Sequence, residues 1–257
     1  MSVQRFDLRG KTALVTGASS GLGEHFARVL AQAGAQVVVA ARRAQRLERL
    51  VTELQGQGHQ ALAVTMDVTD SDSIDAGFTQ AEQACGSVDI LVNNAGIADP
   101  VTFVDMTEGN WRSMMDTNLD GAWRVAHRAT AGMVKAQTGG SIINIASVLG
   151  LRVGTALSHY AVAKAGVVQL TKAMALELAR YNIRVNAIAP GYFRTEMNGD
   201  YFDTDKGQQY ISSKVPLRRL GQLEELSGPL LLLASDAGSF MTGSVLSVDG
   251  GHLNNSL

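Results

Sequence analysis

A tyrosine and a lysine stand four positions apart, at Tyr160 and Lys164, in a stretch whose residues favour a helix. That spacing places both side chains on the same helical face. A phenol at its usual pKa of about 10 is a poor proton shuttle near neutral pH, but a neighbouring ammonium group stabilises the phenolate and lowers that pKa. We therefore expect Tyr160 to give a proton to a carbonyl oxygen, or to accept one from an alcohol, as a general acid/base. A Y-x-x-x-K pair is common by itself, so its meaning depends on the surrounding chain.

Three glycines with the spacing G-x-x-x-G-x-G lie between the first apolar run and the first helix-like segment. Glycine lets a backbone approach a phosphate closely, and the amides and dipole at the start of a helix favour negative charge. The spacing differs from the common G-x-G-x-x-G fingerprint, but its place between a strand and a helix predicts a dinucleotide site. The residues expected to bind the dinucleotide here are Gly17, Ser19, Ser20, Gly21, Leu22 and Gly23.

The end of the second apolar run indicates which dinucleotide binds. A carboxylate there would bind the ribose 2′-hydroxyl of NAD, whereas an arginine accommodates the 2′-phosphate of NADP. The run Val37–Ala41 is followed by Arg42 and Arg43, with no acidic residue. Because a guanidinium matches a phosphate in shape and charge, we predict NADP as the cofactor, with NADPH preferred over NADH. In the alternative interpretation, both arginines are solvated residues at the start of a helix.

These residues must be positioned by short runs rich in Val, Ile and Leu, which alternate with helix-like segments along the chain. The predicted strands are Thr12–Thr16, Gln36–Ala41, Ala61–Met66, Val88–Asn93, Ser141–Ile145, Arg184–Ala189 and Ser244–Val248. The predicted helices are Gly21–Ala33, Ala44–Gln55, Ser71–Ala84, Asn110–Lys135, Tyr160–Arg180 and Leu223–Ala234. We expect Ser71 to cap its helix, and Gly34 to end the first helix in a left-handed conformation.

This alternation predicts a single α/β domain over residues 1–257. Several strands are apolar at consecutive positions, as strands covered by helices on both faces require. Right-handed crossovers then give a Rossmann-type, doubly wound fold, with a mostly parallel seven-stranded sheet and helices on both faces.

The region from residue 191 to residue 214 interrupts the alternation and is polar and aromatic. It follows a predicted strand, so it lies at the carboxyl edge of the sheet, where open α/β sheets bind ligands. Long loops in compact domains are often binding loops. We predict that it forms a lid over the substrate; the alternative is an ordinary surface excursion.

Composition excludes several other classes of protein. With 22 Lys and Arg against 24 Asp and Glu, the formal charge is −2, which disfavours nucleic-acid binding. The longest aliphatic stretch, Leu230–Ala234, is far shorter than the ~20 residues that span a bilayer. A single cysteine, Cys85, and scattered histidines predict no metal site. With no targeting segment recognised at either end, we expect a cytoplasmic protein.

The motifs and their order resemble the short-chain dehydrogenase/reductase family over essentially the whole chain. The matching segments are Thr16–Gly23, Asn93–Gly96, Asn118, Ser147, Tyr160 with Lys164, and Pro190-Gly191, including the 13 positions from Ser147 to Tyr160. The resemblance implies an oxidoreductase of alcohols and carbonyls in which the cofactor carries the hydride and the protein positions a tuned proton donor.

The resemblance also implies a role for each catalytic residue. Tyr160 is expected to be the acid/base, and Lys164 to bind the nicotinamide ribose and lower the pKa of Tyr160. Ser147 is expected to hydrogen-bond the substrate oxygen. Asn118 is expected to hold a water molecule in a proton relay that continues through Lys164.

Further cofactor contacts follow from the same resemblance. Asp67 and Val68 are expected against the adenine, and Asn94, Ala95 and Gly96 beside the adenosine ribose and the central strand. The residues expected to line the nicotinamide side are Pro190, Gly191, Phe193 and Thr195.

The substrate is less constrained. Besides Ser147 and Tyr160, the candidate pocket residues are Leu149, Val153, Ala156, Leu157, Tyr192, Phe193, Met197 and Tyr201. Because most are apolar, we expect a medium-sized ketone or a 3-oxoacyl compound. The neutral segment Ala136–Gly140 disfavours an acidic acyl carrier protein as the donor of the acyl group.

Other functions and an assembly stay open at this point. The segment Ala189–Met197 is similar to reductases of keto-acids and polyols, so a keto-acid or polyol dehydrogenase is the first alternative. A dinucleotide-binding regulator without turnover is the second. Members of the family that the chain resembles commonly form homotetramers through the long helices and the last strand, so we expect a homotetramer.

Overall fold

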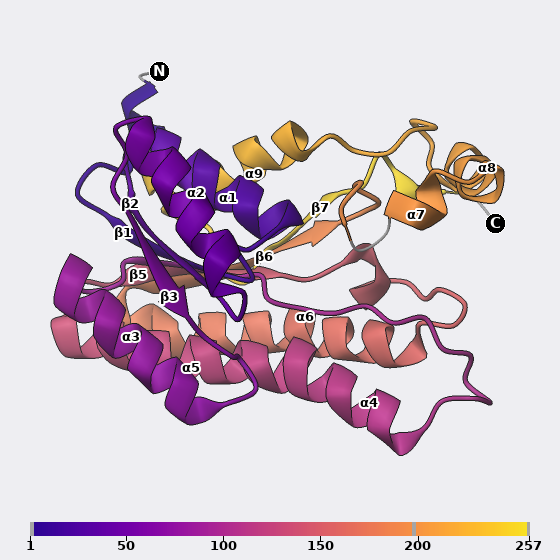
Figure 1. Ribbon diagram of the computed structural model, residues 1–257, viewed down its shortest axis with the longest axis horizontal. Coiled ribbons are helices and arrows are strands. Elements are labelled where there is room, and N and C mark those ends of the chain that lie inside the picture. The colour runs from indigo at the N-terminus through magenta and orange to yellow at the C-terminus, as the bar shows by residue number, and fades with distance from the viewer. Residues whose placement is uncertain (1–2, 197–198, 256–257) are drawn as a thin grey trace.

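In the computed structural model, which describes residues 3–196 and 199–255, seven strands form one sheet in the order β3-β2-β1-β4-β5-β6-β7 (Figure 1). The strands are β1 (Thr12–Thr16), β2 (Gln36–Ala41), β3 (Ala61–Thr65), β4 (Ile90–Asn93), β5 (Gly140–Ile145), β6 (Ile183–Pro190) and β7 (Val245–Val248). Every pairing between neighbouring strands is parallel. The predicted doubly wound α/β fold is therefore confirmed, and its sheet is parallel throughout.

The winding of the sheet reverses beside β1. Val15 of β1 pairs with Val39 of β2 on one side and with Val92 of β4 on the other. The chain therefore builds the sheet outward to β3, returns to the middle at β4, and continues outward to β7. Such a switch point leaves a crevice outside the carboxyl ends of the strands, which is where open α/β sheets bind ligands.

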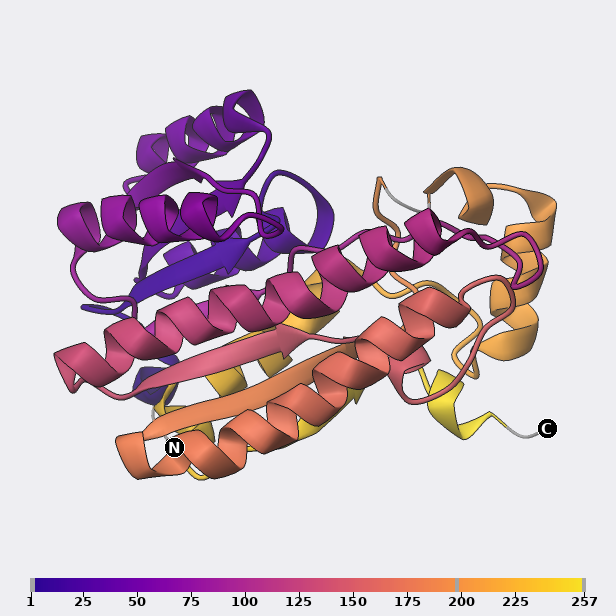
Figure 2. The same cartoon turned by 90° about the horizontal axis from the view of Figure 1, so that it is seen from below.

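Helices cover both faces of the sheet (Figure 1). One face carries α1 (Gly21–Gln32), α2 (Ala44–Gly56) and α9 (Ser227–Ala234); the other carries α3 (Ser71–Cys85), α4 (Glu108–Met115), α5 (Gly121–Ala136) and α6 (Ser158–Leu178). Figure 2, seen from below, shows α4 and α5 running alongside α6.

The two layers explain why the strands are apolar at consecutive positions. Val15 packs into a core with Phe26 of α1 and Leu230 of α9, whereas its neighbour Leu14 packs into the opposite core with Phe78 of α3. Each large apolar side chain buried in this way contributes about 1.5–3 kcal/mol. A polar residue on either face of β1 would forfeit that contribution.

The predicted helix over 110–135 is interrupted. Helix α4 ends at Met115, a π-helical turn covers Asp116–Asp120, and α5 begins at Gly121. Apolar periodicity does not reveal one wide turn inside a continuous helical path, whereas such turns are frequent at functional sites. The turn contains Asn118, which is buried.

The predicted helix ends are partly corrected. Asp70, and not Ser71, caps α3, because its carboxylate accepts a hydrogen bond from the Asp72 amide at 3.0 Å. The carboxylate already takes the position that the Ser71 hydroxyl was expected to fill. Gly34 has a φ of +97° directly after α1, which confirms the predicted left-handed ending.

The irregular region 191–214 contains two helices, α7 (Gly199–Phe202) and α8 (Asp205–Lys214). Helix α8 begins at a cap in which the Thr204 hydroxyl accepts a hydrogen bond from the Gly207 amide at 3.1 Å. This cap was missed because a short polar helix carries little apolar periodicity. Within the ranges described, no helix is both long enough and apolar enough to cross a membrane.

Candidate active site

A cleft of about 580 Å³ lies at the carboxyl edge of the sheet. The residues that line it at or just after the ends of six strands are Thr16, Ala41, Met66, Asn94, Ile145 and Pro190. The cleft therefore crosses the switch point between β1 and β4, as the topology requires.

The predicted cofactor residues converge on this cleft. Those in its lining are Gly17, Ser19, Ser20, Gly21, Leu22, Arg42, Arg43, Asp67, Val68, Asn94, Ala95, Gly96, Tyr160, Lys164, Pro190, Gly191, Phe193 and Thr195. Gly23 does not line the cleft. It lies beneath the loop, where a Cβ atom would collide with the Gly17 carbonyl oxygen and with the Asn94 amide nitrogen.

The glycine loop is held close to β4. Gly17 has a φ of +67°, and a Cβ atom on it would lie 2.9 Å from the Cα of Ala95. The Asn94 side-chain amide donates hydrogen bonds to the carbonyl oxygens of Thr16 at 3.0 Å and of Gly17 at 3.4 Å. Because the glycines leave no side chain above the loop and α1 begins there, the loop can accommodate a pyrophosphate at the helix N-terminus.

Tyr160 and Ser147 both line the cleft, and the Ser147 hydroxyl influences the pKa of the Tyr160 phenol. The Ser147 oxygen also accepts a hydrogen bond from the Leu149 amide at 3.1 Å, which fixes its position after β5. Surrounding protein raises the pKa of Tyr160 by desolvating the phenolate, and the hydrogen bond from Ser147 partly offsets that rise.

The Lys164 ammonium is buried and donates a hydrogen bond to the Ile145 carbonyl oxygen at 2.8 Å. Its nitrogen lies 5.8 Å from the centre of the Tyr160 ring. Burial lowers the pKa of Lys164 to about 8. In this structure desolvation raises the pKa of Tyr160, and Ser147 is the group that lowers it. The expected lowering of that pKa by Lys164 stays a prediction.

Asn118 lies beside Lys164 but has its amide engaged by the protein. Its Oδ1 accepts a hydrogen bond from the Ile97 amide at 2.8 Å, and its Nδ2 donates to the Ile97 carbonyl oxygen at 2.8 Å. A Cβ atom on Gly96 would lie 3.2 Å from Asn118 Oδ1 and 3.7 Å from Lys164 Nζ. Asn118 thus fastens the segment after β4 next to the lysine; its role in a water relay stays a prediction.

At the end of β3, Asp67 organises the turn that lines the cleft. Its Oδ1 accepts hydrogen bonds from the Thr69 amide at 2.9 Å and the Thr69 hydroxyl at 2.8 Å. Its other oxygen lies 3.9 Å from Arg42 Nη1. The Thr69 amide above all holds the pKa of Asp67 below its usual range, so the turn keeps a negative charge.

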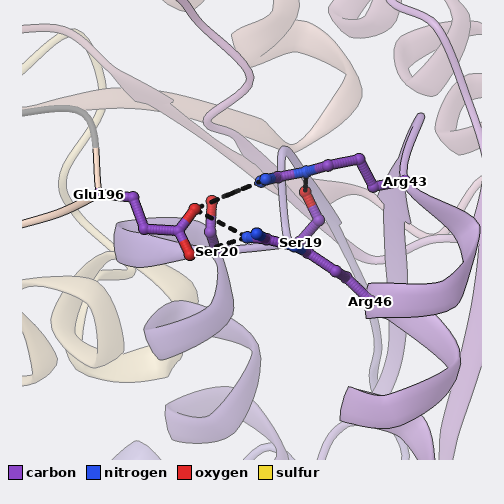
Figure 3. A network of polar contacts seen from close by, with 5 residues as sticks. All are labelled: Ser19, Ser20, Arg43, Arg46 and Glu196. Carbon is purple, nitrogen blue, oxygen red and sulfur yellow. Dashed lines mark hydrogen bonds and ion pairs between the residues drawn. The ribbon is translucent and has the colours of Figure 1, made fainter.

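Arg43, which lines the cleft, and Arg46, which was not predicted from the sequence, form a cationic corner beside Glu196 (Figure 3). Arg43 donates to the Ser19 hydroxyl at 3.0 Å and to the Ser20 hydroxyl at 2.7 Å. Arg46 donates to both carboxylate oxygens of Glu196, at 2.8 and 2.7 Å. The R-x-x-R spacing at the start of α2 could have indicated Arg46, whereas no local pattern indicates Glu196.

Glu196 was missed for a physical reason. It lies 150 positions from Arg46 in the chain and reaches the arginines because the segment after β6 also lines the cleft. The Arg46 guanidinium holds the pKa of Glu196 below its usual range, with Arg43 adding to the effect.

The predicted substrate residues do not form one pocket. Ser147, Tyr160 and Phe193 line the cleft. Leu149 and Leu157 are not in its lining but pack with Tyr160 in a small apolar cluster, and Val153 is 87% exposed.

The aromatic residues after β6 form a cluster of their own. Tyr192 packs edge-on against Phe202 and Tyr210, and its hydroxyl lies 3.0 Å from the Tyr210 hydroxyl. Tyr192 lines a separate cavity of about 290 Å³, and Tyr201 is half exposed. Met197 lies outside the described residues. In the part of the chain that is described, no group of His, Cys, Asp or Glu side chains could hold a metal ion.

The fold and the cleft are those of a dinucleotide-binding α/β protein, and comparison with known proteins identifies the family. A family profile described as enoyl-(acyl carrier protein) reductase matches residues 17–252. The chain is 39% identical to a 3-oxoacyl-[acyl-carrier-protein] reductase of Thermotoga maritima, over 95% of this chain and 98% of the relative. It is 37% identical to the 5-keto-D-gluconate 5-reductase of Escherichia coli, over 96% and 97%.

Solved structures agree. A gluconate 5-dehydrogenase from Burkholderia cenocepacia, in complex with NADP and tartrate, superposes with a TM-score of 0.94 and 36% identity, covering 98% of each chain. The chain therefore belongs to the short-chain dehydrogenase/reductase family, whose members are oxidoreductases of alcohol and carbonyl groups that use NAD(P).

Proposed function

We propose that this chain is an NADP(H)-dependent oxidoreductase that transfers hydride between the nicotinamide and a carbonyl or secondary alcohol, with Tyr160 as the acid/base. One observation carries the proposal: Tyr160, Ser147 and Lys164 line the same cleft as the glycine loop. A proton donor thus faces the space where the cofactor would lie.

The residues present fit such a cofactor. The close approach of Gly17 to Ala95 leaves a cradle without side chains for the pyrophosphate, and Lys164 lines the same cleft and would bind the nicotinamide ribose. When bound, the nicotinamide supplies or takes up the hydride.

In reduction, the Tyr160 hydroxyl donates its proton to the substrate oxygen, and Ser147 orients that oxygen by a second hydrogen bond. The raised pKa of Tyr160 keeps the phenol protonated near neutral pH, which is the state that reduction needs. Lys164 and Asn118, which both lie close to Gly96, are the groups through which we propose that the proton is replaced.

NADPH is proposed as the preferred cofactor because β2 ends in Arg42 and Arg43, with no carboxylate among the residues that follow directly. Support comes from the relative crystallised with NADP and from a putative 2-deoxy-D-gluconate 3-dehydrogenase of Agrobacterium tumefaciens with bound NADP. Dissociation constants for NADPH and NADH, measured by fluorescence titration, test the preference. Arg43→Ala should weaken NADPH binding by about tenfold, as expected for loss of one charged hydrogen-bonding partner.

A matched control separates the loss of the Arg43 contact from a general loss of positive charge. Arg49→Ala removes an exposed arginine of the same helix that does not line the cleft, and it should leave both constants unchanged. Tighter binding of NADH than of NADPH by the unaltered protein would contradict the preference.

For the substrate, we propose a medium-sized ketone or a 3-oxoacyl compound, because Ile97, Ala98 and Phe193 give the cleft apolar lining. A keto-acid or polyol is the second candidate, favoured by the names of the gluconate, ketogluconate and rhamnose enzymes among the relatives. NADPH oxidation with ketones, 3-oxoesters, a 3-oxoacyl thioester, keto-acids and sugars distinguishes the two. Silence across the panel with NADPH bound would favour a regulator without turnover.

We also propose a cytoplasmic homotetramer in which the segment 191–214 acts as a lid over the substrate. Exposed apolar side chains on the long helices support the assembly: Trp123 of α5 is 51% exposed and Leu176 of α6 is 84% exposed. Such a surface is typical of a contact with another chain. Light scattering that gives the mass of one chain would contradict the assembly.

A further inference from the structure

The carboxylate of Glu196 covers the cationic corner of the cleft (Figure 3). Both its oxygens accept hydrogen bonds from Arg46 Nη1, at 2.8 and 2.7 Å, and Oε2 lies 3.5 Å from Arg43 Nη1. Glu196 and Arg43 line the cleft, and all three side chains are about half exposed. Water and a ligand can therefore reach the same atoms.

Arg43 is oriented toward this corner by the glycine loop. Its Nε and Nη2 donate to the hydroxyls of Ser19 and Ser20, at 3.0 and 2.7 Å, which leaves Nη1 directed toward Glu196. A guanidinium binds a carboxylate and a phosphate with the same N–H groups and similar geometry. A phosphate monoester in this corner and the Glu196 carboxylate therefore compete for the same donors.

We propose that Glu196 is a built-in competitor for the 2′-phosphate of NADP(H), which must displace its carboxylate from Arg43 and Arg46 to bind. The proposal rests on the function proposed above, because it takes NADP(H) as the ligand of the cleft. Glu196 then weakens binding of the phosphorylated cofactor and leaves NAD(H) binding unchanged. Glu196 therefore reduces the preference for NADP(H) over NAD(H) below the preference that the two arginines would give without it.

The charges give the direction of the effect. Bound phosphate would bring a dianion to two cations that already carry one carboxylate, so retention of Glu196 would add repulsion. Removal of the carboxylate frees the arginine donors and removes that repulsion. Because exposed ion pairs are individually weak, we expect a gain of about three- to tenfold in affinity.

The test uses ligands that carry no nicotinamide, so it is independent of turnover. Adenosine 2′,5′-bisphosphate carries the 2′-phosphate, and 5′-AMP lacks it. Calorimetric titration of Glu196→Gln should show about three- to tenfold tighter binding of the bisphosphate than the unaltered chain shows, with 5′-AMP unchanged. The gain should shrink as the salt concentration rises, since both competing interactions are exposed and screened.

Glu53→Gln is the matched control. Glu53 lies in α2, pairs with Arg28 of α1 and does not line the cleft, so this variant removes one exposed carboxylate outside the site. It should leave both constants unchanged, which excludes a general effect of net charge. Unchanged or weaker bisphosphate binding by Glu196→Gln would overturn the proposal, since the carboxylate would then be neutral or would help the arginines to hold the phosphate.

The same titrations keep the two proposals separable. Cofactor preference is read from the unaltered chain alone, as the ratio of its NADPH and NADH constants. The role of Glu196 is read from the ratio between variant and unaltered chain for the bisphosphate. If the unaltered chain bound NADPH and NADH equally well, the proposed cofactor preference would be contradicted. If Glu196→Gln still bound the bisphosphate more tightly than the unaltered chain does, competition by Glu196 would still be supported.

Discussion

The Lys164 ammonium donates its hydrogen bond to the Ile145 carbonyl oxygen at 2.8 Å, and not to the Tyr160 phenol that stands one helical turn away. The contact joins α6 to the last residue of β5 at the bottom of the cleft. It places a cation in a buried position with one acceptor, which explains why the pKa of Lys164 falls to about 8.

The lysine should therefore make stability depend on pH. Its pKa is 10.5 in the unfolded chain and about 8 in the folded chain, so between these values only the unfolded chain holds the proton. The cost of burying the charge is full below pH 8 and disappears as the pH rises toward 10.5. Relative to Lys164→Met, the unaltered chain should gain roughly 2–3 kcal/mol of unfolding free energy between pH 7 and pH 10.

Denaturant unfolding at several pH values measures that difference. Lys172→Met, which removes an exposed ammonium group from the same helix, is the control for net charge. A difference between Lys164→Met and the unaltered chain that does not vary with pH would contradict the assignment.

Removal of the phenol should abolish chemistry and spare binding. Tyr160→Phe deletes the hydroxyl that hydrogen-bonds Ser147 and keeps the ring that packs beside Leu149. We expect kcat to fall by about 10²–10⁴, the usual contribution of a positioned acid/base, with the NADPH dissociation constant nearly unchanged, because the ring keeps its packing. Tyr181→Phe, at an exposed tyrosine, is the control; a Tyr160→Phe variant that keeps its activity would refute the mechanism.

Ser147 should set the pH at which alcohol oxidation becomes fast. Its hydrogen bond lowers the pKa of Tyr160, so Ser147→Ala should raise that pKa further. Oxidation needs the phenolate, so the rate of alcohol oxidation should rise with pH. The rising limb of this pH–rate profile should lie at higher pH in Ser147→Ala than in the unaltered chain. Ser147→Thr keeps a hydroxyl and should restore the position of the limb. An unmoved limb in Ser147→Ala would exclude coupling between the two hydroxyls.

The glycine beneath the phosphate loop should tolerate no side chain. A Cβ on Gly23 would collide with the Gly17 carbonyl oxygen, so Gly23→Ala must displace the loop that lines the cleft. We expect NADPH binding to weaken at least about tenfold, because the displaced loop would lose backbone hydrogen bonds to the cofactor phosphates. Gly56→Ala, in α2 with no atom within 4 Å of the new Cβ, should be neutral or slightly stabilising. Equal behaviour of the two variants in calorimetry would contradict this account.

Much of the fold follows from local patterns. Strands such as Thr12–Thr16 are apolar at every interior position because both faces are covered, and that pattern is legible without any contact. Helix ends were less well predicted. Asp70 and Ser71 are both good caps, and only the backbone path decides which side chain accepts the amide hydrogen bond.

The site divides in the same way. The sequence by itself determined the sheet, the glycine loop, the arginines after β2 and the residues Ser147, Tyr160 and Lys164, because each belongs to a motif whose spacing reports a strand end or a helical face. Only the tertiary structure decided that Lys164 bonds to Ile145, that Asn118 sits in a π-helical turn, and that Glu196 reaches Arg46. Arg46 and Glu196 are 150 positions apart, and the bond from Lys164 joins α6 to β5, so both contacts depend on how the elements stack, which no local preference encodes. The π-helical turn has no signature in the apolar periodicity.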